Sequence, residues 1–420
     1  MTTTPVRISE SEKAPRTRSV LREAAFLRLW SATTASGLAT WALPFVLGLA
    51  VLDHTIGAAT LGLLLAARTA GFLVAVAIGG VLADRYSRRA VVAWAGLAAA
   101  AATPLLAFGL GRSPALMAGA ALVAGAGQGA CRPAFQALTA EVVDGERRQQ
   151  ANAAMTLAVR ATTLGGPSLT ALLALWLDTS TLLLGIGLLW LIAALVPGPG
   201  APRTAPATTE HPSFIGEFTE GLREARRHPW FLAGLCALTT VIATGYSATG
   251  VALPLISRDR YGTQWVLAAA MTAYTLGALA GALLTARLRP RAQGWTALAG
   301  LGCYGFAPLS LVFDVPPALV ITAYVLAGLG IELFNVPWFT ATQREVAPDK
   351  LARVSALDFL MSYGLAPAAL ALMAPAIDAL GTRTVLATCA ALCFAAPAAA
   401  ALVPSSRDFT RRPGQQTPTA

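Results

Sequence analysis

Charged residues are scarce in this sequence. Asp, Glu, Lys and Arg make up only 12% of the 420 residues, whereas soluble domains contain about 25%. Apolar stretches follow one another between about Ser31 and Pro404, and most reach the ~20 residues that a helix needs to cross a bilayer. The composition therefore excludes an ordinary soluble protein and predicts an integral membrane protein.

Histidine and cysteine are also rare. His54, His211 and His228 lie in or beside polar segments, so no histidine is placed to carry a proton inside an apolar stretch. All five cysteines lie within apolar stretches, at Cys131, Cys236, Cys303, Cys389 and Cys393. We therefore expect ordinary packing roles for the cysteines, and no disulfide framework, metal site or other cofactor.

Only two lysines are present, Lys13 and Lys350, and neither follows a glycine. A nucleotide-binding phosphate loop needs a Gly-Lys pair, so transport driven by ATP hydrolysis in this chain is excluded. No HExxH or GxSxG motif occurs either. We expect that the chain is not an enzyme and that an ion gradient, with protons as the default, supplies its energy.

The apolar stretches predict twelve membrane-spanning helices. Their expected limits are Trp30–Val51, Ala59–Leu82, Ala90–Leu110, Ala115–Ala137, Ala151–Leu177, Thr181–Pro197, Phe231–Ile256, Trp265–Leu288, Trp295–Phe313, Pro317–Thr342, Val354–Ile377 and Thr384–Pro404. The longest polar interruption, 198–230, divides them into a first half over 30–197 and a second over 231–404. Phe214, Ile215, Phe218 and Leu222 share one helical face in this interruption, which predicts an amphipathic helix at the membrane surface.

Positive charge predicts the orientation. If residues 1–29 are a cytoplasmic tail, most of the 31 Lys and Arg residues fall in cytoplasmic segments, as the positive-inside rule requires. Residues 405–420 then form a second cytoplasmic tail. The net charge of +10 is explained by this distribution, so we expect a lipid bilayer rather than a nucleic acid as partner.

The two halves contain short similar segments, as a duplicated transporter would. Pro133-Ala-Phe135-Gln-Ala137 recurs 204 residues later as Pro337-Trp-Phe339-Thr-Ala341. The segment GGVLADRYSRR, from Gly79 to Arg89, has a weaker counterpart, AGALLTARLRPR, beginning at Ala280.

The loop Gly80-Val-Leu-Ala-Asp84-Arg85-Tyr-Ser-Arg88-Arg89 resembles the signature loop of the major facilitator superfamily. This resemblance implies an all-α fold of twelve helices, in two six-helix halves around a central cavity, that works by alternating access. It also implies that Asp84 contacts the start of span eleven and that Arg85, Arg88 and Arg89 complete charge contacts closing the cytoplasmic side. For Arg88 and Arg89, anchoring to the membrane surface is the alternative.

Three further segments resemble the exporters related to macrolide-efflux and enterobactin-export proteins: GAGQGACRPAFQALTAEVVDGERRQQANA, GGPS, and GIELFNVPWFTATQREVAPDKLARVSALD. The resemblance implies a monomeric, proton-coupled exporter of a small molecule in a bacterial inner membrane. The sequence departs from the antiporter pattern in span five, where Ser168 to Ala171 follow Gly166-Pro167, and at Gly125, where an arginine is usual.

Five charged residues lie inside the predicted spans, outside the last turn of each: Arg68, Arg132, Arg160, Glu332 and Asp358. Charges in hydrocarbon are costly and mark functional sites. Glu332 is the first candidate for a proton carrier, because burial favours the neutral acid and a nearby arginine favours the carboxylate. A permanent ion pair with Arg160 or Arg68 is the alternative, as is a carboxylate bonded to neighbouring hydroxyl and backbone groups.

Other roles are open for the remaining charges. Asp358 is the second proton-coupling candidate, although its place near a helix start favours capping or gating. Arg68 and Arg160 are candidates for binding an anionic part of a substrate. Arg132 is nearer the cytoplasmic end, where its side chain is expected to reach lipid headgroups.

Small and aromatic residues complete the candidate positions. Gly125 and Gly129 are spaced for close helix packing, and Gly166-Pro167 is expected to interrupt span five through a kink or close packing. Trp41 and Trp338 are candidates for the substrate cavity, with interface or packing roles as the alternative. We expect export of a hydrophobic or amphipathic molecule; import or facilitated passage of an anionic metabolite is the alternative, and a non-transporting receptor or enzyme is a remote one.

Overall fold

The computed structural model describes residues 19–198, 214–262, 265–288 and 290–410. Over this part of the chain every regular element is a helix, and nine helices are long and apolar enough to cross a membrane. Two shorter apolar helices, Thr179–Leu195 and Ala368–Leu380, add to these. This confirms the predicted all-α membrane fold.

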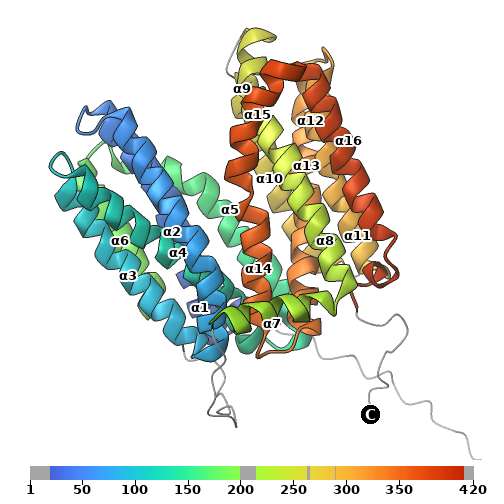
Figure 1. Cartoon of the computed structure of the whole chain (residues 1–420), viewed down its shortest axis with the longest axis horizontal. Coiled ribbons are helices and arrows are strands. Elements are labelled where there is room, and N and C mark those ends of the chain that lie inside the picture. Colours follow the sequence, from blue (N-terminus) through green and yellow to red (C-terminus); the bar gives the residue numbers. More distant parts are fainter. Residues whose placement is uncertain (1–18, 199–213, 263–264, 289, 411–420) are drawn as a thin grey trace, which may run out of the picture.

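The first half is a bundle of six helices with two short 3-10 turns (Figure 1). Its elements are η1 Val20–Arg22, α1 Ala24–Leu52, α2 Ala58–Arg85, α3 Arg88–Gly109, α4 Pro114–Val142, η2 Gly145–Arg147, α5 Arg148–Leu173 and α6 Thr179–Leu195. The bounds of these six helices lie within six residues of the predicted span limits. Side-chain caps mark where several of the helices begin. Ser87, Ser113 and Asp178 accept hydrogen bonds from backbone N–H groups at the starts of α3, α4 and α6.

The second half is a bundle in which several spans are divided. Its elements are α8 Pro229–Thr240, the π-helical turn η3 Val241–Tyr246, α9 Ser247–Asp259, α10 Trp265–Arg287, α11 Gln293–Gly302, η4 Cys303–Gly305, α12 Phe306–Val312, α13 Pro317–Glu345, α14 Leu351–Gly364, α15 Ala366–Leu380, α16 Thr382–Ala401 and η5 Pro404–Arg407. Span eleven is divided at Leu365, because the proline in the first turn of α15 has no backbone N–H with which to continue the hydrogen bonds of α14. At Gly166-Pro167, α5 continues through both residues to Leu173, so the proline does not end the helix.

Glycines bring the long helices together in the same way in both halves. A Cβ on Gly125 of α4 would lie 1.9 Å from the carbonyl oxygen of Arg68 in α2, and one on Gly129 would lie 2.4 Å from that of Phe72. In the second half, a Cβ on Gly328 of α13 would lie 1.9 Å from the carbonyl oxygen of Tyr274 in α10. The backbones therefore approach more closely than any side chain would allow.

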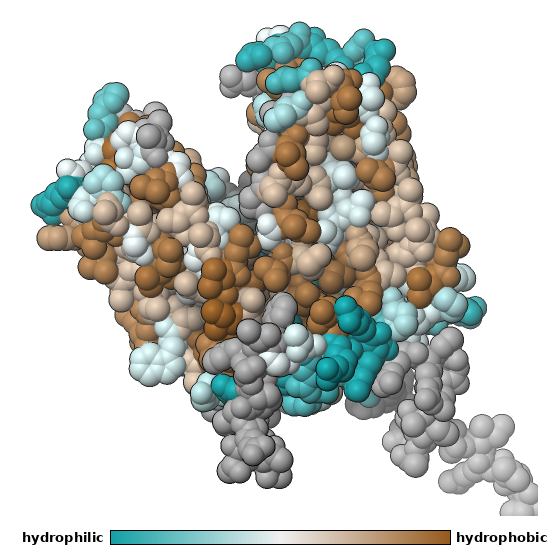
Figure 2. Space-filling model, viewed as in Figure 1, coloured by the Kyte–Doolittle hydropathy of each residue, from teal (hydrophilic) through white to brown (hydrophobic). Residues whose placement is uncertain are grey.

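The two bundles meet at one end and separate at the other (Figure 1). The end where they meet, here the closed end, carries η1, η5 and the linking helix α7 Phe214–Arg226. The space-filling view shows a wide hollow between the halves at the opposite, open end (Figure 2). The predicted helix over 214–222 is confirmed as α7, whereas the predicted tail 1–29 lies mostly outside the described residues.

The predicted tail 405–420 is corrected in its first part. Ser405, Ser406 and Phe409 are buried against the second half. Arg344 donates hydrogen bonds to the carbonyl oxygens of Asp408 and Phe409, both at 3.2 Å. The bundle therefore extends to about residue 410, and residues 411–420 lie outside the described part of the chain.

Candidate functional site

One ion pair joins the two halves near the middle of their helices. Arg160 of α5 donates from Nε to Oε1 of Glu332 in α13 at 2.6 Å, and its Nη2 also contacts that oxygen. At about 1.5 Å per residue, both side chains lie roughly 18–20 Å along their helices from the closed end. The sequence left open whether Glu332 pairs with Arg160 or with Arg68. In the structure its partner is Arg160.

The two members of this pair differ in exposure. The side chain of Glu332 is 1% exposed and that of Arg160 is 21% exposed. Asn335 lies one turn along α13 and donates to the second carboxylate oxygen of Glu332 at 3.5 Å. The guanidinium carbon of Arg160 lies 5.7 Å from the ring centre of Tyr274 in α10. A buried carboxylate of one half therefore faces a half-buried cation of the other, and each charge offsets part of the cost of burying its partner.

Arg68 has a different environment from Arg160. Its Nη2 donates to the carbonyl oxygen of Thr40 in α1 at 3.0 Å and to Oε1 of Gln128 in α4 at 2.7 Å. Within the described residues, it makes no ion pair with a carboxylate. The guanidinium is thus oriented by neutral groups of its own half.

Arg132 and Asp358 do not take the positions expected from the sequence. The guanidinium of Arg132 lies 6.0 Å from the ring of Phe359 in α14, so it faces the other half rather than lipid headgroups. Asp358 lies two turns inside α14, buried to 4% exposure, and accepts hydrogen bonds from Trp338 at 3.3 Å and Ser362 at 3.4 Å. The expected capping role is wrong for Asp358; proton coupling there is untested.

The two tryptophans proposed for the cavity differ in burial. Trp338 is fully buried within an aromatic cluster formed by Trp230, Phe231, Phe334, Trp338 and Phe409. It does not line the opening, because its ring fills the closed-end core of the second half. Trp41 stays 37% exposed, and its Cβ lies where a side chain on Gly166 of α5 would clash, at 2.9 Å.

Asp84 closes the interface at the closed end. Its carboxylate accepts hydrogen bonds from the backbone N–H groups of Ala352 at 3.1 Å and Arg353 at 2.8 Å, in the first turn of α14. The side chain of Arg353 adds a hydrogen bond at 3.2 Å. Gly80 permits this approach, since a Cβ there would lie 2.4 Å from that of Ala356.

The arginines of the same loop divide between the halves. Arg88 binds Glu141 at 2.6 Å within its own half and also donates to the carbonyl oxygen of Pro348 in the other. Arg89 donates to the carbonyl oxygens of Pro197 and Leu195, at the end of α6. The expectation that Arg89 closes the interface is therefore wrong; Arg85 is partly buried at the end of α2.

A second closure, made of neutral groups, was missed from the sequence. Gln149 at the start of α5 donates to the carbonyl oxygens of Thr285 and, at 2.7 Å, Leu288 at the end of α10. Nearby, Asn152 donates to Thr340 at 2.9 Å and to Gln343 at 3.0 Å. Gln149 precedes Arg353 by 204 residues, the offset of the repeated Pro133 and Pro337 segments, so the repeat contained the signal for this closure.

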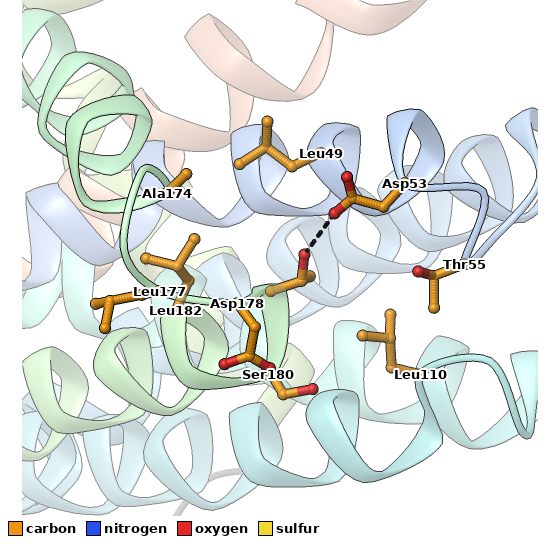
Figure 3. Close-up of a pocket in the computed structure, with 10 residues that line it drawn as sticks. Leu49, Asp53, Thr55, Leu110, Ala174, Leu177, Asp178, Ser180 and Leu182 are labelled. Carbon is orange, nitrogen blue, oxygen red and sulfur yellow. Dashed lines mark hydrogen bonds between the residues drawn. The ribbon is translucent and has the colours of Figure 1, made fainter.

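A separate pocket of about 550 Å³ lies at the open end of the first half. It lies between the ends of α1, α3 and α5 and the start of α6, and Asp53 within it accepts a hydrogen bond from Thr179 at 3.2 Å (Figure 3). Asp178 caps α6 beside it. Across the described ranges, no group of three or more His, Cys, Asp or Glu side chains is arranged to hold a metal ion.

Comparison with known proteins agrees with this architecture. Residues 29–371 match the model of the Major Facilitator Superfamily. A search of curated proteins finds no match in sequence. Among solved structures, the human organic anion transporter MFSD10 (TETRAN) superposes with a TM-score of 0.70 at 16% identity, covering 92% of this chain and 100% of that one.

A bacterial homologue of the iron transporter ferroportin, solved in an outward-facing state with soaked iron, gives a TM-score of 0.65 at 16% identity. That match covers 90% of this chain and 98% of the other. At such identities the likeness concerns the fold alone.

Proposed function

Because the chain belongs to the major facilitator superfamily, and is therefore a membrane transporter rather than an enzyme, we propose that it is a proton-coupled exporter of a hydrophobic or amphipathic small molecule. It acts in a bacterial inner membrane, as a monomer with both termini in the cytoplasm. In this orientation the closed end is cytoplasmic and the hollow opens outward. The proton gradient is its energy source.

The observation that carries this proposal is the Arg160–Glu332 pair across the halves. An ionised Glu332 ties α5 to α13 in the outward-open conformation. A proton from outside neutralises the carboxylate and removes this tie, because a neutral acid no longer attracts the guanidinium. The halves are then free to rock to the inward-open conformation, where Glu332 releases its proton to the cytoplasm.

Export then follows from the order of the steps. The return of the empty transporter requires the protonated pair, and the outward movement of the substrate occurs with the ionised pair. One proton therefore enters for each cycle that moves a substrate out. The second coupling candidate, Asp358, lies away from this pair, bonded to Trp338 and Ser362.

The test is accumulation of dyes and antibiotics in bacteria that lack their own efflux pumps, at matched membrane levels of each variant. We expect at least one compound to accumulate less in cells with the intact protein, and both Glu332→Gln and a protonophore to abolish this difference. Asp314→Asn is the matched control, since Asp314 is 74% exposed and pairs with Arg260 at the open end. Undiminished export by Glu332→Gln would contradict the assignment of Glu332 and direct attention to Asp358.

A second candidate function is uptake of an anionic metabolite together with a proton. Arg68, which pairs with no described carboxylate, favours it. The sign of the coupling separates the two functions: in an exchanger, acidification weakens substrate binding, whereas in co-transport protonation of Glu332 releases Arg160 and tightens the binding of an anion. Substrate binding measured at pH 5.5 and 7.5 distinguishes them.

A further inference from the structure

The cationic charge of Arg68 is not neutralised by the protein. Of its five N–H groups, the two on Nη2 bind Thr40 and Gln128, both through neutral oxygen atoms. No described residue accepts a hydrogen bond from Nε or Nη1. Two anchoring bonds fix the plane of the guanidinium while the rest of its donor edge stays available.

The depth of Arg68 makes this unpaired charge significant. It lies sixteen residues, or about 24 Å, along α2 from Asp84 at the closed end. An isolated charge at such depth is costly and is retained where it faces a water-filled cavity or a ligand. If the side chain served only to join α1, α2 and α4, a neutral donor would do so without that cost.

Arg68 also lies beyond the contacts that α2 makes with α14 through Gly80 and Leu73. Nearer the closed end, α2 packs on α14 through Gly80, and the side chain of Leu73 reaches Gly364, the last residue of α14. More than one helical turn farther from the closed end, Arg68 is half-buried. Its guanidinium therefore belongs to the part of α2 on the open-end side of the contact between Leu73 and Gly364.

From this geometry we propose that the transported molecule carries an anionic head group, a carboxylate, sulfonate or phosphate, which binds the free edge of Arg68. A guanidinium presents parallel N–H groups that match the oxygens of such a group. Gln128 and Thr40 hold the guanidinium in place, and the apolar part of the molecule lies against the walls of the hollow. Arg160 is unavailable for this purpose while Glu332 is ionised.

This inference rests on the proposed function only in requiring a substrate path between the halves; it does not depend on the direction of transport or on the coupling ion. Its test therefore uses equilibrium binding without a gradient. The probes are naphthalene derivatives with one substituent each: 1-naphthoate, 1-naphthalenesulfonate and 1-naphthyl phosphate as anions, 1-naphthamide as the neutral form and 1-naphthylmethylamine as the cation. Binding to purified protein in a non-ionic detergent is measured by calorimetry at pH 7.5.

We expect at least one anion to bind more tightly than the amide and the amine. Arg68→Gln should weaken that anion about tenfold or more, because a hydrogen bond to a charged group is lost, and should leave the amide and the amine within about twofold. The affinity of Arg68→Lys for that anion should fall between those of the intact protein and Arg68→Gln, since an ammonium keeps the charge but not the planar edge. Arg383→Gln is the control, as Arg383 is exposed in the first turn of α16.

Absence of any preference for an anion in the intact protein would overturn the proposal, and so would equal anion binding by Arg68→Gln and the intact protein. A different result would also support the proposal: Arg68→Lys and Arg68→Gln bind the anion equally weakly while both keep the melting temperature of the intact protein. This result would show that the bidentate contact is essential. Glu332→Gln should keep the preference for the anion even where it loses proton coupling. Failure of the anion proposal and failure of proton coupling are thus read from different measurements.

Discussion

The carboxylate of Asp84, at the end of α2, accepts a hydrogen bond of 2.8 Å from the backbone N–H of Arg353, in the first turn of α14. Asp84 thereby caps a helix of the other half, for which Lys350 provides no side-chain cap of its own. A carboxylate satisfies free N–H groups and opposes the positive end of the helix dipole. The closed end is thus held by a helix cap that exists only while the halves are together.

Removing the charge of this cap, while an asparagine oxygen can still accept a hydrogen bond, should favour opening of the closed end. A carboxylate at a helix start contributes about 0.3–2 kcal/mol, so Asp84→Asn should raise the population of the inward-open state by about two- to thirtyfold. Hydrogen exchange of the backbone amides of Ala352 and Arg353 should speed up by a similar factor. Asp259→Asn, at an exposed pair with Arg258 outside this interface, should leave that exchange unchanged; equal rates in both variants would refute a capping role for Asp84.

The neutral closure should respond differently from the charged one. Gln149→Ala removes bonds to the carbonyl oxygens of Thr285 and Leu288, each worth about 0.5–1.5 kcal/mol. We expect faster exchange in the first turn of α5 by about five- to 150-fold, and the same factor at 0.05 M and 1 M salt, because no ion pair is involved. The effect of Asp84→Asn should instead shrink at high salt.

Gln150→Ala is the control for this comparison. Gln150 is adjacent on α5, but its side chain accepts from Val20 of the same half at 3.4 Å. Its removal should not alter exchange at the interface between halves. A salt dependence as steep for Gln149→Ala as for Asp84→Asn would contradict the distinction between a neutral and a charged closure.

The fold followed closely from the sequence because apolar length and loop charge are local properties. Helix bounds such as those of α10, expected over 265–288 and found at Trp265–Arg287, needed no knowledge of packing. The division of span eleven at Leu365 was missed, since the apolar stretch continues without a break across the proline.

The site was predictable only where charge made it conspicuous. Arg160 and Glu332 stood out as costly residues at similar depth, and they do pair. Trp338 was wrongly assigned to the cavity. An aromatic residue in a span can serve packing or ligand binding, and sequence periodicity does not show which face of the helix turns toward the cavity. Gln149 was overlooked since a neutral amide outside the predicted spans carries no such cost.

Acid should release α7 from the closed end. Burial raises the pKa of Glu220 and Glu224, but Arg353 and Lys350 outweigh burial and hold both pKa values below the ordinary 4.5. Carboxylates with a lowered pKa stabilise the docked helix above pH 4.5, and this contribution is lost as the pH falls through the lower values of the docked state. Arg227 and His228 also face Glu224, at 3.1 and 3.5 Å.

Hydrogen exchange of α7 at matched labelling extents measures this release. Protection relative to α10 should fall by several-fold between pH 5 and pH 3 in the intact protein. The double variant Glu220→Gln and Glu224→Gln should show low protection at both pH values, because neutral amides at these positions make no ion pair with Lys350 or Arg353. Protection that declines equally in the double variant would assign the acid sensitivity to another group.

Glycine at position 125 should be indispensable to the first half, while glycine at 119 in the same helix should not. A methyl group on Gly125 would lie 1.9 Å from the carbonyl oxygen of Arg68, whereas one on Gly119 would meet nothing within 4 Å. Gly125→Ala should therefore lower the free energy of unfolding by about 1–3 kcal/mol through overpacking. Gly119→Ala should raise it by about 0.5–1 kcal/mol, because alanine loses less conformational entropy in a helix.

Denaturation of the purified protein in mixed micelles, followed by tryptophan fluorescence, measures both changes. Since Gly125 packs on the backbone of Arg68 itself, Gly125→Ala should also displace that guanidinium and weaken anion binding, while Gly119→Ala should not. Gly328→Ala tests the equivalent crossing of α13 on α10. It should destabilise the protein without altering the Arg68 site, because its methyl group would press on Tyr274 and both residues lie in the second half. Equal stability of the 125 and 119 variants would show that α2 and α4 can move apart without cost, and the close crossing would then not be what positions Arg68.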